Sequence, residues 1–222
     1  MDDQHLPTSG LGCCVMWNPL PQSFFEPSAQ QVAPALLGHW LIRNTPAGPC
    51  GGLIVETEAY LRDDPACHSY GGETSRNRVM WGDPGRAYVY LIYGYHFCVN
   101  AVCQPAGIAE AVLIRALEPA LGQTLMRGKR LVGTDRELSN GPAKLCEALD
   151  INRRLDGSNL CDANSPLFIA SNSEANRFFQ LRGPVVNTTR VGITKAAGLP
   201  LRFYLEGSPF VSRRAARDKL SP

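Results

Sequence analysis

Several motifs that define common enzyme classes are absent from this sequence. The 222 residues contain no Cys-x-x-Cys pair, no Walker-type loop, no Gly-x-Gly-x-x-Gly run and no His-Glu-x-x-His motif. Their absence argues against zinc ribbons, zinc deaminases, thioredoxin-like redox sites, P-loop enzymes and dinucleotide-binding domains. The four histidines show no metal-ligand spacing. We therefore expect a protein that uses neither a metal nor another cofactor.

The sequence also lacks a long apolar run. No stretch approaches the roughly 18 apolar residues that a membrane-spanning helix needs. The first ten residues carry Asp2 and Asp3 and lack the basic and apolar regions of a secretory signal. We expect a soluble intracellular protein with no membrane partner, in which the eight cysteines stay reduced.

Lysine is scarce, with 4 residues against 18 arginines, and the net charge is only +2. The charge is unevenly spread, because residues 1–75 carry a net charge of −6 and residues 76–222 a net charge of +8. The planar fork of arginine suits phosphate groups, so the basic part is a candidate surface for a polyanion. Ordinary solvated arginine would produce the same asymmetry.

The composition predicts one globular domain. Hydrophobic residues make up 44% of the chain, and 21 glycines and 17 prolines predict many turns. We divide the chain into a flexible N-terminal tail over residues 1–22, a folded domain over 23–212 and a basic C-terminal tail over 213–222.

Local patterns predict an α+β fold built around an antiparallel sheet. Helices are expected over 28–37, 119–130 and 142–151, strands over 40–43, 53–61, 87–93, 96–103, 111–117, 190–195 and 201–205, and irregular structure over 152–183.

The strand IVETEAY carries the first candidate for chemistry. Side chains alternate between the two faces of a strand, so Glu56, Glu58 and Tyr60 share one face. A carboxylate in a partly buried cleft can hold and deprotonate a water molecule. The residues taken alone favour an exposed strand face instead.

Tyrosines gather in the run AYVYLIYGYHF. Tyr88 and Tyr90 share a strand face, and Tyr93 and Tyr95 flank Gly94 at the expected tip of a hairpin. Aromatic rings can stack on a nucleobase or wedge between base steps. Tyrosine is also an ordinary half-buried strand residue, although a hairpin tip offers little core to pack against.

Three polar residues stand out by their surroundings. His68 lies in an expected loop, where binding side chains concentrate. Asn100 and Arg115 lie within apolar strands, where a polar residue either satisfies a backbone neighbour or lines a site.

These motifs taken together resemble one known family. The runs GGLIVETEAYLRDDPACHSYGG, TSRNRVMW, GRAYVYLIYGYHFCVN, VLIRALEP, NGPAKLCEALDI, TRVGI and PLRFY are similar, in this order, to those of the alkyladenine (3-methyladenine) DNA glycosylases. The resemblance extends over roughly residues 30–212. It implies a single α+β domain with a curved antiparallel sheet, surrounding helices and a protruding hairpin that enters the minor groove of DNA.

The resemblance also implies roles for the residues singled out above. The base-binding pocket would place the flipped base between Tyr60 on one side and His68 and Tyr90 on the other. Asn100 would line this pocket and disfavour normal guanine by crowding its 2-amino group.

Catalysis and DNA intercalation fall on four other residues. Glu58 would activate the water and Arg115 would lie beside that water. Tyr93 would take the place of the flipped nucleotide in the stack, and Tyr95 lies next to it at the tip.

The implied activity is base-excision repair by a monomer acting on duplex DNA that contains damaged purines. Alkylated or deaminated purines, of the 3-methyladenine type with hypoxanthine and ethenoadenine as candidates, would be hydrolysed from the sugar, leaving an abasic site. All four lysines lie outside the block that holds Glu58, Tyr60 and Tyr90, so no amine nucleophile for strand nicking is expected there. Two alternatives are a nucleic-acid-binding module without catalysis and a hydrolase of free nucleosides.

The sequence departs from the family pattern at Pro34, Arg62, Ser75, Tyr95 and His96. The departure at Tyr95 bears on the shape of the wedge and on base preference.

The implied pocket also predicts the register of the hairpin. Tyr90 and Asn100 can share a face only if the connecting loop has an odd number of residues or contains a bulge. We expect the three-residue loop 94–96, which pairs Tyr90 with Asn100.

Overall fold

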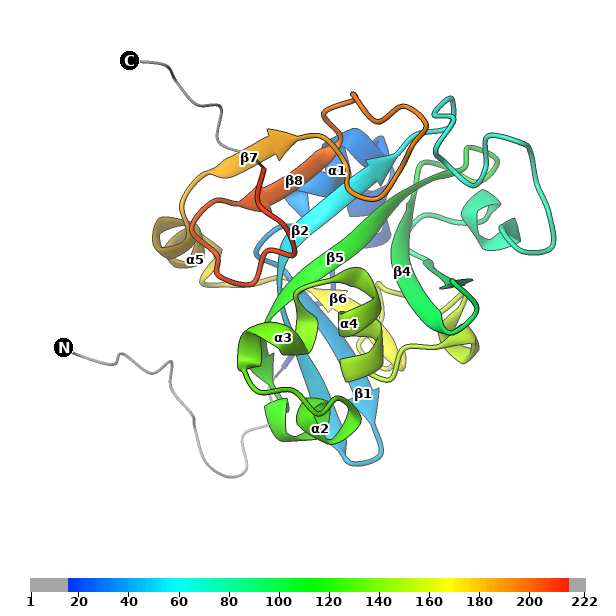
Figure 1. Ribbon diagram of the computed structural model, residues 1–222. Coiled ribbons are helices and arrows are strands. Elements are labelled where there is room, and N and C mark those ends of the chain that lie inside the picture. The colour runs from blue at the N-terminus through cyan, green and yellow to red at the C-terminus, as the bar shows by residue number, and fades with distance from the viewer. Residues whose placement is uncertain (1–15, 216–222) are drawn as a thin grey trace, which may run out of the picture.

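A computed structural model describes residues 16–215 of the chain (Figure 1). The strands are β1 (Trp40–Thr45), β2 (Gly48–Tyr60), β3 (Ala87–Ile92), β4 (His96–Cys103), β5 (Glu110–Leu121), β6 (Leu167–Ala170), β7 (Val185–Thr188) and β8 (Arg202–Leu205). The α-helices are α1 (Ala29–Ala35), α2 (Gln123–Lys129), α3 (Asp135–Ser139), α4 (Pro142–Ala148) and α5 (Ala175–Arg182). Short 3-10 helices span η1 (Gln22–Phe25), η2 (Arg78–Trp81) and η3 (Arg153–Leu155).

The two long strands β2 and β5 form the centre of a single antiparallel sheet. The strand order is β3-β4-β5-β2-β1-β6, with β8 pairing both β2 and β7. One side of β2 pairs with β5, while the other side pairs first with β1 and then, from Glu56 to Glu58, with β8. Because β2 changes partner along its length, the sheet curls into a half-barrel. The predicted α+β fold around a curved antiparallel sheet is confirmed.

Two adjacent glycines allow β2 to lie close to both neighbouring strands. A Cβ atom on Gly51 would overlap the carbonyl oxygen of Leu41 in β1, and a Cβ atom on Gly52 would overlap the carbonyl oxygen of Glu118 in β5. Both obstacles are backbone atoms, which cannot rotate away. The pair Gly51-Gly52 therefore sets how tightly the centre of the sheet can pack.

We expect Gly52→Ala to lower the free energy of unfolding by about 1–3 kcal/mol, because overpacking forces backbone shifts. For a chain of this size, each kcal/mol lowers the melting temperature by about 2–4 °C. Thermal unfolding measures the effect. Gly71→Ala is the matched control, because a Cβ atom there meets nothing within 4 Å. Equal melting temperatures for the two variants would contradict the close approach.

Four of the α-helices pack against strands of the sheet. Helix α1 packs against β2 and β5, while α3 and α4 pack against β5 and α4 also against β4. In Figure 1, α2, α3 and α4 (green) lie together in the lower half of the view, where β1 also lies, and α1 (blue) lies in the upper half near β8. Helix α1 begins with a capping box at Ser28 and tolerates Pro34 near its end. Helix α4 begins with Pro142 in its first turn, as the sequence predicts.

Three expectations about local structure are wrong. Pro119 does not open a helix but lies in β5, opposite Gly52, and α2 begins only after the left-handed Gly122. Residues 152–183 are not mostly irregular, since they contain β6 and α5. Residues 190–195 form a loop, and the strand that pairs with β8 lies earlier, at β7.

The boundary of the N-terminal tail also needs correction. The ring of Trp17 makes edge contacts with the rings of Trp40 and Phe168. Leu20 is buried, and its N–H donates to the carbonyl of Ile169. Packing therefore begins before residue 23, and residues 1–15 lie outside the described part of the chain.

Candidate active site

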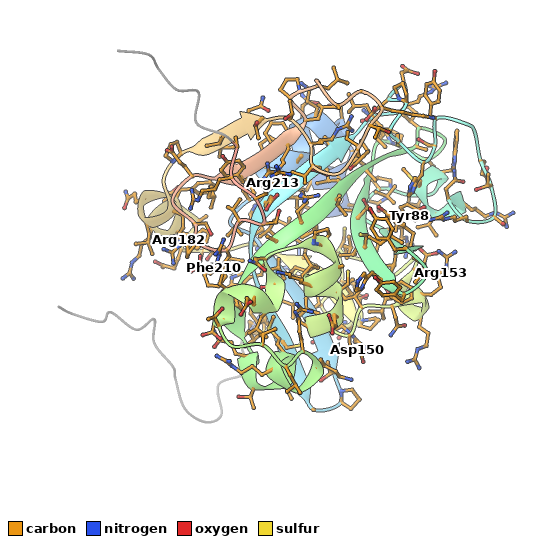
Figure 2. The ribbon with its side chains drawn as sticks, in the orientation of Figure 1. Tyr88, Asp150, Arg153, Arg182, Phe210 and Arg213 are labelled. Carbon is orange, nitrogen blue, oxygen red and sulfur yellow. The ribbon has the colours of Figure 1, made fainter. Side chains whose placement is uncertain are left out.

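A cavity of about 100 Å³ lies between β2, β3, β4 and the loop that follows β2. The sequence-predicted pocket residues Tyr60, His68, Tyr90 and Asn100 all line it. Each comes from a different one of these segments. Figure 2 labels Tyr88, a fifth lining residue, on the side of the molecule where β4 lies. The fold thus brings the four predicted residues together around one space.

The wall formed by the loop and β3 is aromatic. The rings of Tyr88 and Tyr90 stack with their centroids 5.2 Å apart. His68 meets the ring of Tyr90 edge-on at 4.5 Å, and its Nδ1 lies 3.0 Å from the hydroxyl of Tyr88. His68 keeps an exposed face, yet burial of the ring and then the positive charge of Arg76 lower its pKa below 6.5. At neutral pH this wall therefore carries no positive charge on His68.

Asn100 forms part of the wall contributed by β4. The residue is buried, and its Nδ2 donates to the carbonyl of Tyr88 at 3.1 Å. Both readings of a polar residue in an apolar strand apply here, because Asn100 satisfies a backbone neighbour and also lines the cavity.

Glu58 is a fully buried carboxylate beside the cavity. Its Oε2 accepts a hydrogen bond from the hydroxyl of Tyr60 at 2.9 Å and lies 3.2 Å from Nη1 of Arg115. Its Oε1 accepts a hydrogen bond from the N–H of Val191 at 2.7 Å. The exposed strand face that the sequence alone favoured is therefore wrong, since partners distant in sequence bury this carboxylate. A buried carboxylate beside a cavity is a type of group that can act as a general base.

Tyr60 connects the cavity with Glu58. Burial and the neighbouring charge of Glu58 raise the pKa of the Tyr60 hydroxyl, so it remains a proton donor. The guanidinium of Arg190 lies 4.7 Å from the ring centroid. Arg190 is itself buried, where it pairs with Asp64 and donates to the carbonyl of Ala59 at 3.0 Å. The ring of Tyr60 therefore lies against a guanidinium group that an ion pair and a hydrogen bond of its own hold in place.

Arg115 occupies an irregularity in the pairing of β2 with β5. In the ladder Ala116 pairs with Glu56 and Ile114 with Thr57, so Arg115 is passed over. Bulges of this kind re-aim side chains near functional sites. Burial would lower the pKa of Arg115, but the negative charges of Glu58 and Glu56 outweigh burial and raise this pKa. Arg115 thus remains a buried, permanent cation beside Glu58.

Some residues of the site were not selected from the sequence. Val191 contributes its backbone N–H, which no side-chain pattern could reveal. The alternation of strand faces already placed Glu56 beside Glu58 and Tyr88 beside Tyr90, but no role was assigned to Glu56 or Tyr88 from the sequence.

The hairpin tip projects from the sheet. The side chains of Tyr93 and Tyr95 are 80% and 72% exposed, as the sequence predicts. Tyr93 has a left-handed backbone with φ of 50°, which is unusual for a tyrosine and typical of functional turns. The ring of Tyr95 packs against His96 at 4.2 Å.

The register of the hairpin agrees with an odd-numbered loop but not with the expected pairing. The pairing of Ile92 with His96 leaves the three-residue loop 93–95. Tyr90 pairs with Cys98, and Asn100 pairs with Tyr88. Tyr90 and Asn100 nevertheless share a face as diagonal neighbours, so both reach the cavity.

Metal ligands, cysteines and membrane-spanning helices are the remaining features to consider among the described residues. Within residues 16–215, no group of three His, Cys, Asp or Glu side chains could hold a metal ion. Six cysteines of this region are free thiols, and Cys13 and Cys14 lie outside it. None of the helices between residues 16 and 215 has the length and apolar character needed to cross a membrane.

Comparison with known proteins identifies relatives along most of the chain. Residues 23–209 match the family model described as methylpurine-DNA glycosylase. A protein of Methanoculleus marisnigri is 53% identical over 197 residues, which cover 88% of this chain and 99% of the relative. Proteins of Rhodopseudomonas palustris (strain CGA009) and Carboxydothermus hydrogenoformans are 47% and 44% identical, covering 87% and 88% of this chain and 88% and 99% of their own lengths.

All three relatives carry the name "Putative 3-methyladenine DNA glycosylase". The matched residues 23–209 include all eight strands of the described structure, the residues that line the cavity and Glu58. The chain belongs to the methylpurine-DNA glycosylase family.

Proposed function

We propose that this protein flips alkylated or deaminated purines out of duplex DNA and hydrolyses their N-glycosidic bond with a water molecule activated by Glu58. As a member of its family the chain is a monofunctional DNA glycosylase, a hydrolase of DNA repair. The observation that carries the finer proposal is the adjacency of an aromatic cavity to a buried carboxylate, joined by the hydrogen bond from Tyr60 to Glu58.

The cavity suits a damaged purine. The electron-rich rings of Tyr60 and Tyr90 can stack on a base that carries a positive charge, each contact contributing about 0.5–2 kcal/mol. The pKa of His68 is lowered, so its neutral ring does not repel such a base. In this proposal Asn100 crowds the 2-amino group of normal guanine. The 3-methyladenine type of lesion is the expected substrate, with hypoxanthine and ethenoadenine as further candidates.

Cleavage of the bond places positive charge on the sugar. The carboxylate of Glu58 takes a proton from the water as its oxygen adds to the sugar carbon. The carbon–nitrogen bond breaks, and the base leaves with the bonding electrons. Arg115 lies beside Glu58, where we expect it to help hold the water. An alkylated, cationic base leaves readily because it departs without a full negative charge.

The reaction should end at an abasic site. A strand-nicking enzyme needs an amine nucleophile. Lys129 and Lys144 belong to α2 and α4, away from the cavity, and Lys195 does not line it. We therefore expect DNA strands to be cut only after heat or alkali treatment.

A gel assay tests this proposal directly. A duplex with a single 3-methyladenine-type lesion, hypoxanthine or ethenoadenine is incubated with the protein, and abasic sites are revealed with alkali. We expect release of the damaged base from duplex DNA. Binding without release would indicate a nucleic-acid-binding module. Hydrolysis of free nucleosides but not of duplex would indicate a nucleoside hydrolase.

Binding should also depend steeply on salt. The region 76–222 carries a net charge of +8, and each phosphate that it neutralises contributes about −0.9 to the slope of log affinity against log salt. Fluorescence anisotropy with a lesion duplex at several salt concentrations measures the slope. A single bound copy of the protein per lesion is expected, since one chain contains the whole site. A flat salt dependence would contradict duplex DNA as the partner.

A further inference from the structure

Glu56 is a second buried carboxylate, and the mechanism above gives it no role. It is fully buried and accepts four hydrogen bonds from three elements. Its Oε1 accepts from Nε of Arg115 in β5, from Nε of Arg202 in β8 and from Oγ of Ser212, each at 2.8 Å. Its Oε2 accepts from the N–H of Ser212 at 2.6 Å. A carboxylate with this many donors is fully satisfied as an anion.

The charges around Glu56 balance. Two carboxylates, Glu56 and Glu58, face two guanidinium groups, those of Arg115 and Arg202. Burial would raise the pKa of Glu56, but the charges of Arg115 and Arg202 and the N–H of Ser212 outweigh burial and lower it. Glu56 therefore stays ionised and compensates part of the positive charge of Arg115 and Arg202.

Arg115 is shared between three partners. Its Nε contacts Glu56 at 2.8 Å, its Nη1 contacts Glu58 at 3.2 Å and its Nη2 donates to Oγ of Ser212 at 3.3 Å. The guanidinium thus presents a single nitrogen to Glu58 and turns the rest of its fork toward Glu56 and Ser212. A bidentate pair with Glu58 would be stronger and would make Glu58 a poorer proton acceptor.

Ser212 belongs to the last part of the described chain. It is held on β2 through Glu56, and the carbonyl of the next residue, Arg213, accepts a hydrogen bond from Arg202. Figure 2 labels Arg213 over the central strands, beside β8. The C-terminal segment 211–213 is therefore part of the surroundings of the catalytic pair.

We propose that Glu56 and Ser212 are positioning residues. They hold the guanidinium of Arg115 so that it contacts both carboxylates, and they thereby keep Glu58 available as a base. This inference rests on the proposed role of Glu58. Without the charge of Glu56, Arg115 would turn its fork toward Glu58 and one negative charge would be lost from the cluster. Both changes make protonation of Glu58 less favourable.

The other titratable and charged groups around Glu58 do not reverse the expected direction of this change. They are Tyr60 on β2, Cys98 on β4 and, through Tyr60, Arg190. Tyr60 and Cys98 have pKa values raised by burial and by the charge of Glu58, so both stay neutral at working pH. Arg190 is compensated by Asp64.

The test compares Glu56→Gln with the wild type in single-turnover release of hypoxanthine from a duplex, with enzyme in saturating excess, across a range of pH. Under these conditions a partial loss of folded protein leaves the rate constant unchanged, as long as the folded enzyme still saturates the duplex. We expect the plateau rate constant to fall by about 10- to 100-fold, the range that misplacement of a catalytic group produces. The fall of the rate on the acid side should move to lower pH, and affinity for lesion DNA should not change.

Glu118→Gln is the matched control. Glu118 is a nearly buried carboxylate of β5 that pairs with Arg182 at 2.8 Å, away from Glu58. The substitution removes the same charge from the same sheet, and we expect the wild-type rate and pH profile. Equal behaviour of Glu56→Gln and Glu118→Gln would overturn the inference while leaving the proposed function intact. Absence of release by the wild type would instead contradict the proposed function.

Two variants of Ser212 keep the test decisive if Glu56→Gln fails to fold. Ser212→Ala removes the hydroxyl that contacts Glu56 and Arg115, and we expect a smaller change in the same direction. Ser212→Thr retains the hydroxyl and should recover most of the lost rate. Ser212→Ala with the wild-type rate constant and pH profile would overturn the role of the C-terminal segment.

Discussion

Replacing Glu58 by Gln is expected to reduce base release by at least about 10²–10⁴-fold, the range for loss of a general base. Glutamine preserves the shape of the side chain, and its single carbonyl oxygen can accept the hydrogen bond from either Tyr60 or Val191, which contact different oxygens of Glu58. It cannot take a proton from water at neutral pH. Single-turnover assays with saturating enzyme measure the chemical step alone.

Binding of the lesion duplex by Glu58→Gln should remain close to that of the wild type. Glu58 does not line the cavity that would receive the base, and Arg115 keeps Glu56 as a partner. Anisotropy measurements and a melting curve accompany the kinetic assay. A near-normal rate constant would show that Glu58 is not the base, and a parallel loss of binding would point to a structural role.

Tyr93→Ala is expected to impair base flipping more than chemistry. The ring is 80% exposed and fills no core, so its removal should leave the melting temperature unchanged. Unstacking a base costs a few kcal/mol, and a wedge that replaces it in the stack offsets part of this cost. We expect base release to fall by about 10- to 100-fold for a lesion in a stable pair and by much less for a lesion in a mismatch, which is already partly unstacked.

The comparison of paired and mismatched lesions distinguishes a wedge from a packing residue. Tyr70→Ala serves as a control, since Tyr70 is also exposed, at 58%, but lies outside the tip. Equal losses on both lesions, or a lowered melting temperature, would assign Tyr93 to the packing of the hairpin.

Patterns confined to short segments were predictable from the sequence. The hairpin strands follow from two β-rich runs around Gly94, and α4 follows from Pro142 behind a glycine. The exposure of Tyr93 and Tyr95 follows from their place at a turn. In each case the determining contacts lie within a few residues of the chain, so local chemistry decides the structure.

Features decided by distant partners were not predictable. Pro119 reads as the start of a helix, but pairing with Gly52 keeps it in β5. Glu58 reads as exposed because its donors Arg115 and Val191 are remote, the latter 133 residues away. Strand β6 is only 4 residues long and wholly buried, so it shows no alternation of polar and apolar residues. The role of Val191 depends on its backbone alone.

The distances along the chain between the carboxylates and their partners have a consequence for synthesis. Glu56 and Glu58 leave the ribosome early, whereas Ser212 follows Glu56 by 156 residues. At about 5–20 residues per second this interval is roughly 8–30 s. For this whole time Glu56 lacks the two donor groups of Ser212, and burying an incompletely compensated charge costs several kcal/mol. We therefore expect the middle of β2 to stay accessible to solvent on the nascent chain until residue 212 has been made.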